Sequence, residues 1–265
     1  MYYPVQLPNV FDEEFNETVD YNEEIIPELS DFVICLWSMK PKTSNIKYVR
    51  DLVLIDACTE LVMDATSKTI MFAGPSLTKT AYEEGTRCYE SYIGIKFKPG
   101  AFTQLTGLDA AVVDGKYLDL SEFDLTFSPK NLRNLNFNES KLWLINYIKR
   151  LTHSKIPNEY VQLFDKYHNE PPISATVFYD EFLYSPRQTQ RLFLKNFGLN
   201  PKMVLTVLRF QYCLRLLYQK EVVPKEMLDK IQFSDQSHFI REFKKYVGLT
   251  PYEFLEKIKD DVFLL

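Results

Sequence analysis

Two hydrophobic patterns divide the chain. From Asp31 to about Leu120, apolar residues form short runs or alternate with polar residues, which is the pattern of β-strands. Beyond Asn138, apolar residues recur three and four positions apart, which is the pattern of amphipathic helices. The sequence therefore predicts an α+β protein, with a β-rich first half and a helical second half.

The β-rich part contains strand candidates separated by turn-forming residues. They span residues 32–37, 51–55, 60–63, 69–72, 93–97 and 117–120. Residues 64–68 have the composition of a hairpin loop, and residues 101–105 that of one helical turn. Residues 1–30 are acidic and aromatic without a clear period, so they are either an arm or the first strands. The pattern does not distinguish a barrel from a sandwich.

Two amphipathic helices follow a polar, Asn-rich loop. The first runs to about Thr152 with Leu142, Ile145 and Ile148 on one stripe, and the second spans residues 158–167. One interpretation is that both helices cover the β domain. The other is that the stripe forms a subunit contact and the protein is a homodimer. Residues 168–172 then predict a hinge into the last third of the chain.

A repeat organises that last third. The segments 191–193 and 198–201 return as 241–243 and 248–251, at a constant offset of 50 residues. A repeat of this length is one supersecondary unit used twice. A single short helix with Arg, Gln and Lys outside is usually only a solvated surface, whereas two copies with the same spacing favour a functional repeat.

Each copy predicts a short helix with a defined start and end. In the first copy Ser185 is a favourable N-cap, Pro186 fits the first helical position and Gly198 ends the helix. Ser234 and Gly248 have the same positions in the second copy. A shorter helical segment precedes each copy, at residues 175–183 and 225–231. The arrangement predicts two helix-turn-helix units.

A long helix separates the two units. It starts at Pro201 and runs to about Gln219, so at about 1.5 Å per residue it would span roughly 28 Å. That length is comparable with the roughly 34 Å of one DNA turn, so the two units could enter successive major grooves. Arg209 and Arg215 on this helix could reach the DNA backbone or pair with acidic residues.

These motifs resemble a known family. Residues 184–193, 233–243 and 248–251 are similar to the DNA-binding domain of the AraC/XylS transcription regulators, and the similarity covers roughly residues 171–255. One position departs from the family pattern, because Gln232 stands where a glycine usually precedes the phenylalanine of the second turn. If this position is left-handed, the glutamine is strained and the turn is looser.

The β-rich half carries a less specific resemblance. Residues 56–61, 74–75 and 94–101 are similar to the uncharacterised β-rich domain found ahead of some AraC-type DNA-binding domains. Many regulators of this family have a cupin-like barrel at this place. The two resemblances imply the domains 1–125 (β-rich, regulatory), 126–170 (helical connector) and 171–265 (double helix-turn-helix).

The resemblance to AraC regulators also implies which side chains contact DNA. Matched position by position, the base-reading residues are Arg187, Gln190 and Arg191 in the first copy and Gln236, His238 and Arg241 in the second. Arginine and glutamine can form bidentate hydrogen bonds with guanine and adenine edges in the major groove. Arg191 and Arg241 could instead brace the fold through a carboxylate. The expected phosphate contacts are Lys195, Lys202, Lys244 and Lys245.

Charge is unevenly distributed along the chain. The net charge of −5 argues against a protein that coats nucleic acid indiscriminately. From Pro171 onward there are 14 Lys and Arg against 11 Asp and Glu, a balance of +3 that leaves −8 for residues 1–170. Between Ser185 and Lys245 the counts are 12 and 5, a balance of +7. The positive charge therefore coincides with the repeat, as expected of a DNA-binding region.

The composition excludes several kinds of site. The histidines His153, His168 and His238 all lie beyond the β-rich half, so a cupin-type histidine metal site is excluded. The four cysteines show no close pairing, and neither a phosphate-binding glycine loop nor a nucleophile paired with a histidine is present. We therefore expect no metal, no cofactor and no enzymatic activity. The apolar runs are too short to cross a membrane and no signal sequence opens the chain, so we expect a cytoplasmic protein.

Together these features predict a sequence-specific transcription regulator whose partner is double-stranded DNA. We further expect contact with RNA polymerase, and a small-molecule or protein effector at the N-terminal domain. An alternative function is a protein-interaction adaptor whose helical half docks on an acidic protein. Binding to DNA falls steeply with salt because counterions are released, so the salt dependence distinguishes the two functions.

Overall fold

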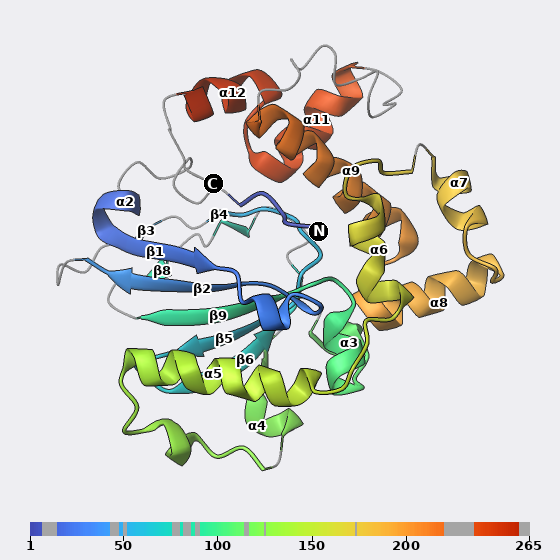
Figure 1. The fold of residues 1–265 in the computed structure, drawn as a ribbon. Helices are drawn as coiled ribbons and strands as arrows, with labels where there is room; N and C mark the ends of the chain where they lie inside the picture. Colours follow the sequence, from blue (N-terminus) through green and yellow to red (C-terminus); the bar gives the residue numbers. More distant parts are fainter. Residues whose placement is uncertain are drawn as a thin grey trace.

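The computed structural model describes residues 1–6, 15–42, 48–49, 52–75, 80–81, 86–87, 91–113, 117–124, 126–172, 174–219 and 236–259. Over these residues an antiparallel sheet occupies the first half of the chain, and helices occupy most of the second (Figure 1). The α+β fold predicted from the hydrophobic pattern is confirmed.

One antiparallel sheet forms the centre of the N-terminal half. Its strand order is β1-β2-β9-β5-β6-β10, so strands that pair are often distant in the sequence. The strands are β1 (Val19–Glu24), β2 (Val33–Pro41), β5 (Glu60–Asp64), β6 (Thr69–Ala73), β9 (Tyr92–Phe97) and β10 (Tyr117–Asp119). Two short ribbons pair β3 (Tyr48–Val49) with β8 (Thr86–Arg87) and β4 (Leu52–Val53) with β7 (Thr80–Ala81).

The predicted hairpin is present between β5 and β6. Asp64 lies opposite Thr69, and its carboxylate accepts hydrogen bonds from the amides of Thr66 and Ser67 at 2.7 and 3.0 Å. Of the two alternatives for residues 1–30, the structure shows a first strand, β1, at residues 19–24. It lies at the edge of the sheet, and its positions alternate between buried or half-buried and exposed although most of its side chains are polar.

Strands β2 and β9 approach closely at one glycine. Gly94 lies opposite Trp37, and a Cβ atom at position 94 would come within 2.1 Å of the Trp37 ring. The indole therefore occupies the space above Gly94. It stacks on Tyr21 with ring centroids 6.4 Å apart, and its Nε1 donates a hydrogen bond to Glu60 at 3.1 Å. A larger residue at position 94 would displace the ring.

Helix α5 (Phe137–Thr152) covers one face of the sheet (Figure 1). Asn136 caps it, two residues before the Asn138 that the sequence suggests, through a reciprocal pair of hydrogen bonds with Glu139. Ile148 of the predicted stripe is buried against the sheet, Ile145 is partly buried and Leu142 is exposed. For α5 the interpretation as a cover of the β domain is confirmed, and a subunit contact stays a prediction.

The other helices of the described residues lie around the sheet and in the C-terminal half. They are α2 (Phe15–Thr18), α3 (Ala101–Thr106), α4 (Leu120–Phe123), α6 (Glu159–Tyr167), α7 (Ala175–Asp180), α8 (Pro186–Phe197), α9 (Pro201–Tyr218), α11 (Gln236–Val247) and α12 (Pro251–Lys259). Short 3₁₀ turns are η1 (Pro27–Leu29), η2 (Ala110–Val113) and η3 (Pro129–Leu132). The predicted helix 225–231, Gln232 and Ser234 lie outside the described residues.

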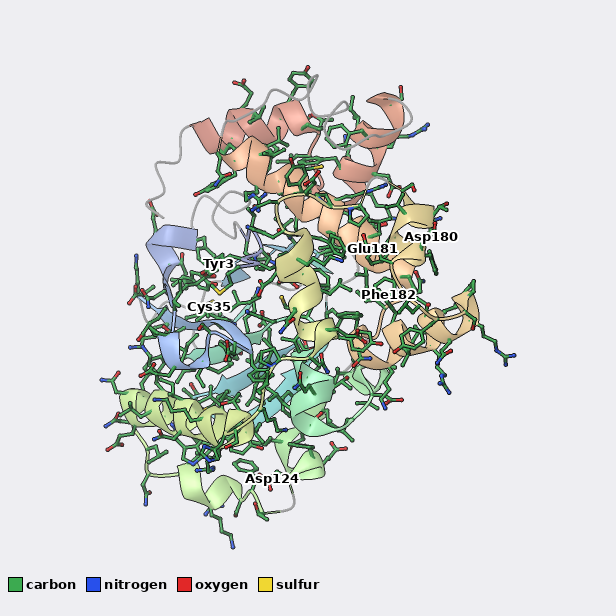
Figure 2. All side chains as sticks on the ribbon, turned by 45° about the vertical axis from the view of Figure 1, so that its right-hand side comes forward. Tyr3, Cys35, Asp124, Asp180, Glu181 and Phe182 are labelled. Atoms are coloured by element: carbon green, nitrogen blue, oxygen red, sulfur yellow. The ribbon has the colours of Figure 1, made fainter. Side chains whose placement is uncertain are left out.

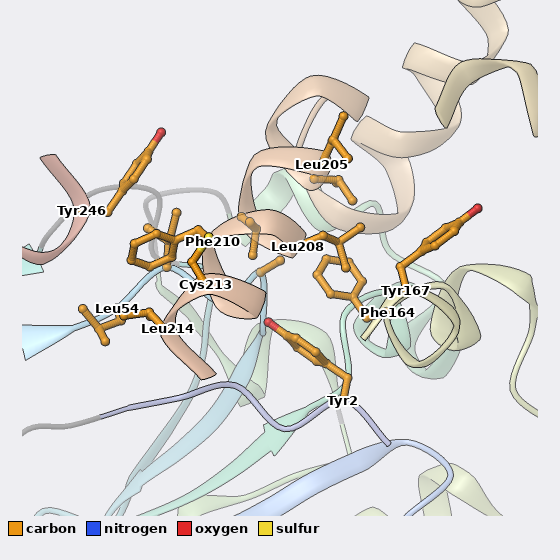
Figure 3. Packing of buried hydrophobic residues seen from close by; sticks show 14 of the residues in the cluster. Tyr2, Leu54, Phe164, Tyr167, Leu205, Leu208, Phe210, Cys213, Leu214 and Tyr246 are labelled. Atoms are coloured by element: carbon orange, nitrogen blue, oxygen red, sulfur yellow. The ribbon is translucent and has the colours of Figure 1, made fainter. Parts of the chain in front are cut away.

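A shared core joins the two halves of the chain. It contains buried residues of α6, α7, α8, α9, α11 and α12 together with Tyr2, Ile34, Cys35 and residues 54–58 of the N-terminal half. Figure 3 shows Tyr2 and Leu54 beside the apolar side of α9. The sheet has a separate core of its own beneath α5, whereas the apolar contacts of the shared core continue past residues 168–172. The domain boundaries themselves stay a prediction.

Helix α6 belongs mainly to this shared core. The rings of Tyr160 and Phe164 lie 6.0 and 5.9 Å from the ring of Phe197 in α8, and Tyr167 lies 5.8 Å from Phe178 in α7. Helix α6 also contacts the N-terminal half, because Lys98 pairs with Asp165 at 2.7 Å and the Tyr2 ring lies 4.9 Å from the Phe164 ring. The helix therefore packs on both halves rather than covering the β domain alone. Its aromatic residues pack on other aromatic rings, which no local pattern in the sequence indicates.

Gln211 of α9 links the two halves by hydrogen bonds. It is buried, its Nε2 donates to the Ile55 carbonyl at 2.7 Å, and its Oε1 accepts from the Val5 amide at 2.8 Å. Beside it, Gln6 makes paired hydrogen bonds of 2.9 Å with the backbone of Leu54. Both polar ends of the Gln211 amide are therefore satisfied inside the core.

The two arginines of α9 hold the segment that precedes α7. Arg209 donates from Nε and Nη2 to the Pro172 carbonyl at 3.1 and 2.8 Å, and Arg215 Nη1 lies 2.8 Å from His168 Nδ1. We predicted that these arginines reach DNA or pair with acidic residues. The structure instead places them against a backbone carbonyl and a histidine, which the sequence did not predict. Each contact spans more than thirty residues of chain, which the local sequence does not reveal.

His168 gives this junction a pH dependence. Burial and the charge of Arg215 lower the pKa of His168 from 6.5 to about 4. The unfolded chain takes up a proton below about pH 6.5 and the folded chain does not, so stability should fall as the pH drops from 6.5 to about 4. The side chain is half-buried, so we expect a loss of only about 1–2 kcal/mol.

The measurement is denaturant unfolding of wild type and His168→Gln across this pH range. The variant should lose less stability than wild type on acidification. His153→Gln is the control, because His153 is exposed at the end of α5. Identical pH profiles for wild type and His168→Gln would contradict the prediction.

Candidate nucleic-acid interface

Helix α8 presents a polar face to solvent. The Ser185 hydroxyl accepts from the Gln188 amide at 3.3 Å, Pro186 occupies the first turn, and Gly198 ends the helix with a left-handed φ of 69°. Arg187, Gln190 and Arg191 are exposed, and their three- and four-residue spacing places them on one face. Figure 2 shows nitrogen-tipped side chains of α8 extending away from the molecule.

The opposite face of α8 fixes the helix in the shared core. Thr189, Phe193, Asn196 and Phe197 are buried there. The Phe193 ring lies 5.0 Å from Phe182 and 5.2 Å from Phe197, in edge-to-face and tilted contacts. Aromatic packing on one side therefore holds the polar face at a defined orientation.

Helix α11 repeats this arrangement in the second copy. Phe239, Phe243 and Val247 are buried, as the repeat predicts, while Arg241 and Lys244 are exposed. Gln236 and His238 lie on the first turn of α11, and their side chains lie outside what the structure describes. The next helix, α12, starts with a capping box, because Thr250 and Glu253 form reciprocal hydrogen bonds of 2.7 and 3.2 Å.

A cleft of about 490 Å³ separates the two units, between α9, α11 and the start of α7. Lys202 of α9 and Lys245 of α11 line it, together with Arg209, Glu242 and several aromatic rings. Lys245 Nζ lies 5.0 Å from the centre of the Tyr246 ring. The structure thus brings two of the predicted phosphate contacts into one cleft.

Burial and the nearby Glu242 raise the pKa of Tyr246, so its hydroxyl stays protonated at neutral pH. A protonated hydroxyl at the edge of a cleft lined by lysines can donate a hydrogen bond to an anionic oxygen. Tyr246 is therefore a candidate polar contact that the sequence does not single out, because its spacing marks it only as a core residue.

A second groove of about 600 Å³ lies along the polar face of α8. Predicted site residues form one wall: Arg187, Gln190, Arg191 and Lys195. Asp109 and Ala111, next to and within η2 of the N-terminal half, contribute the other wall. Arg241 and Lys244 line neither of the two hollows. Asp109 precedes α8 by more than seventy residues, so nothing in the sequence connects it with this site.

The alternative structural role for Arg191 and Arg241 finds no support in the described part of the chain. Neither side chain forms an ion pair with a residue that the structure describes, and both are exposed. Two exposed arginines at equivalent positions of the repeat therefore remain available to a ligand.

The described cysteines do not offer a reactive site. Cys35, Cys58 and Cys213 are buried, and burial raises the pKa of the Cys35 thiol to about 12. The thiols of Cys58 and Cys213 shift in the same direction. Within the described ranges no group of three potential metal ligands occurs, and no helix there is long and apolar enough to span a membrane.

Helices α8 and α11 each have one buried face and one exposed face carrying arginines, and each ends at a left-handed glycine, as the reading helices of helix-turn-helix proteins do. Residues 179–257 match a protein family described as a helix-turn-helix domain, which is of the AraC type. Residues 26–119 match a domain of unknown function, DUF6597. The chain therefore carries an AraC-type helix-turn-helix domain in its C-terminal part and a DUF6597 domain ahead of it.

Solved structures of ToxT from Vibrio cholerae are similar to this chain at low identity. An apo lysine-to-alanine variant is 12% identical, covering 91% of this chain and 97% of that chain with a TM-score of 0.38. Wild-type ToxT bound to an unsaturated fatty acid is also 12% identical, covering 93% of this chain and 98% of that chain with a TM-score of 0.38. ToxT bound to a methylnaphthalenyl butenoic acid is 13% identical, covering 91% of this chain and 99% of that chain with a TM-score of 0.36. A comparison with curated protein sequences gave no match.

Proposed function

We propose that the chain binds a specific duplex with α8 and α11 in successive major grooves. The observation that carries this proposal is the exposed face of Arg187, Gln190 and Arg191 on a helix whose opposite face is fixed in the core. Helix α9 has 18 residues, so it separates the two units by about 27 Å, close to one DNA turn.

The side chains divide into two roles in this proposal. Base edges are read by Arg187, Gln190 and Arg191 of α8 and by Gln236, His238 and Arg241 of α11. Phosphates are bound by Lys195, Lys202, Lys244 and Lys245. The first set would specify sequence, and the second would set affinity and the salt dependence of binding.

Further parts of the proposal concern partners. We propose RNA polymerase as the protein partner, a small-molecule or protein effector at the N-terminal domain, and dimerisation through α5, where Leu142 is exposed. A protein of this kind acts in the cytoplasm and catalyses no reaction. The support for an effector is the shared core, because a ligand that alters the N-terminal half would also alter the surface on which α8 and α9 pack.

The full chain and residues 171–265 alone should both bind a duplex selected from a random pool better than a scrambled one. For four lysine–phosphate contacts, log K should fall with log salt at a slope of about −4. A second fragment, residues 157–265, keeps α6 and its aromatic contacts, so we expect it to unfold at higher denaturant concentration than residues 171–265.

The measurement is fluorescence anisotropy with both duplexes across a salt series. A folded protein that binds both duplexes equally would show that the base-reading assignment is wrong. A protein that binds no duplex, but does bind an acidic protein with little salt dependence, would favour the adaptor function.

A further inference from the structure

The N-terminal half places an acidic residue beside the polar face of α8. Asp109 is exposed and lines the 600 Å³ groove opposite Arg187, Arg191 and Lys195. It forms no ion pair with any residue in the described part of the chain. The groove is therefore lined by cations on one wall and by a carboxylate on the other.

This wall is fixed to α8 by contacts at the end of the helix. The Thr103 hydroxyl of α3 donates to the Lys195 carbonyl at 2.9 Å. A methyl group added at Gly198 would come within 3.3 Å of the Ala110 carbonyl oxygen, so the turn η2 lies directly against the end of α8. Asp109 immediately precedes this turn. The Val112 amide of the turn donates a 3.0 Å hydrogen bond to the Asp109 carbonyl.

A duplex that receives the N-terminal part of α8 in its major groove brings its phosphates to the flanks of that helix. One flank in this structure carries Asp109. Charges separated by less than a Debye length, about 10 Å at 0.1 M salt, interact without full screening. A carboxylate at this position repels the phosphates that the lysines attract.

We propose that Asp109 of the N-terminal domain weakens DNA binding by the first reading helix, so that this domain sets the affinity of the protein for DNA through the position of one carboxylate. The inference rests on the proposed function, because it assigns α8 to DNA. It adds to that function an acidic determinant outside the helix-turn-helix domain.

The test compares full-length wild type, Asp109→Asn and Asp109→Lys on two duplexes, one selected by the wild-type chain and one scrambled. Asp109→Asn should tighten binding to both by about three- to tenfold at low salt, and Asp109→Lys should tighten it further. The gain should shrink as salt rises. Asp20→Asn is the matched control, because Asp20 is an exposed acid on β1, away from α8 (Figure 1).

Each outcome has one meaning. A gain for Asp109 variants that exceeds the gain for Asp20→Asn supports the proposal. Unchanged affinity for both Asp109 variants, or weaker binding by either of them, overturns it. If wild type does not distinguish the selected duplex from the scrambled one, the base-reading function fails instead, while the effect of Asp109 on the two duplexes is still measured. Thermal unfolding of each variant confirms that the fold is unchanged.

Discussion

Replacing Lys96 with methionine should lower the free energy of unfolding by about 3–5 kcal/mol. Lys96 Nζ lies 2.9 Å from Asp56 Oδ2 and 3.1 Å from Glu60 Oε1, and the Lys96 and Asp56 side chains are only 7% and 4% exposed. Methionine has a similar length and no charge, so the substitution leaves the buried Asp56 and the 21% exposed Glu60 without their cation. That loss exceeds the energy of an ordinary surface ion pair because the Asp56 carboxylate is shielded from water.

The same variant should respond to pH in a characteristic direction. Burial raises the pKa of Glu60 in wild type, and Lys96 opposes that shift. Without Lys96 the pKa of Glu60 rises further above that of the unfolded chain. A group whose pKa is higher in the folded state stabilises the fold at low pH and loses this contribution as the pH rises. The Lys96→Met variant should therefore recover part of its stability on acidification towards the ordinary carboxyl range.

Urea unfolding at several pH values measures both effects. Lys141→Met is the matched control, because Lys141 pairs with Glu24 at a partly exposed site and should contribute at most about 1 kcal/mol. Equal stability of Lys96→Met and wild type at neutral pH would show that the cluster is solvated in solution. A loss that does not change with pH would point to packing rather than charge.

Arg187→Ala and Gln190→Ala should each relax sequence preference at two or three neighbouring base pairs. A bidentate contact discriminates against the wrong base by about 1–3 kcal/mol, whereas a phosphate contact strengthens binding to all sequences. Lys244→Ala should therefore weaken all sites equally and reduce the salt slope by about one unit. Arg241→Ala should have an intermediate effect, because Gln232 replaces the usual glycine in the turn before its helix.

Binding to a library of single-base variants of the selected duplex decides between these roles. Lys130→Ala, at an exposed lysine of the N-terminal half, should leave both preference and salt slope unchanged. If Arg187→Ala and Gln190→Ala lower affinity uniformly while Arg241→Ala changes preference, the two copies of the repeat have the opposite roles.

The features that the sequence predicts correctly are those determined within one or two helical turns. Ser185 and Gly198 take the expected capping positions because each bonds to backbone only three or four residues away. The inward faces of α8 and α11 follow from helical periodicity alone. The β5–β6 hairpin is predictable for the same reason, since its pairing begins at a short loop.

The features that the sequence does not predict depend on contacts between distant segments. The strand order of the sheet, the packing of α6 on α8 and the contact of Arg209 with the Pro172 carbonyl all require the folded chain. Asp109 is the clearest example. Nothing in the sequence distinguishes it from other acidic residues, and only the folded chain places it beside α8. Periodicity describes which side of an element is buried, and it carries no information on what covers that side.

The protein has two tryptophans, one in the sheet and one in α5, which covers the sheet. Trp37 lies above Gly94 in the sheet, and Trp143 of α5 stacks on Tyr147 with ring centroids 5.3 Å apart. Intrinsic tryptophan emission therefore reports on the sheet and α5, and it does not report directly on α8 or α11. A change in the emission spectrum on addition of DNA would show that binding at α8 and α11 alters the conformation of the sheet through the shared core.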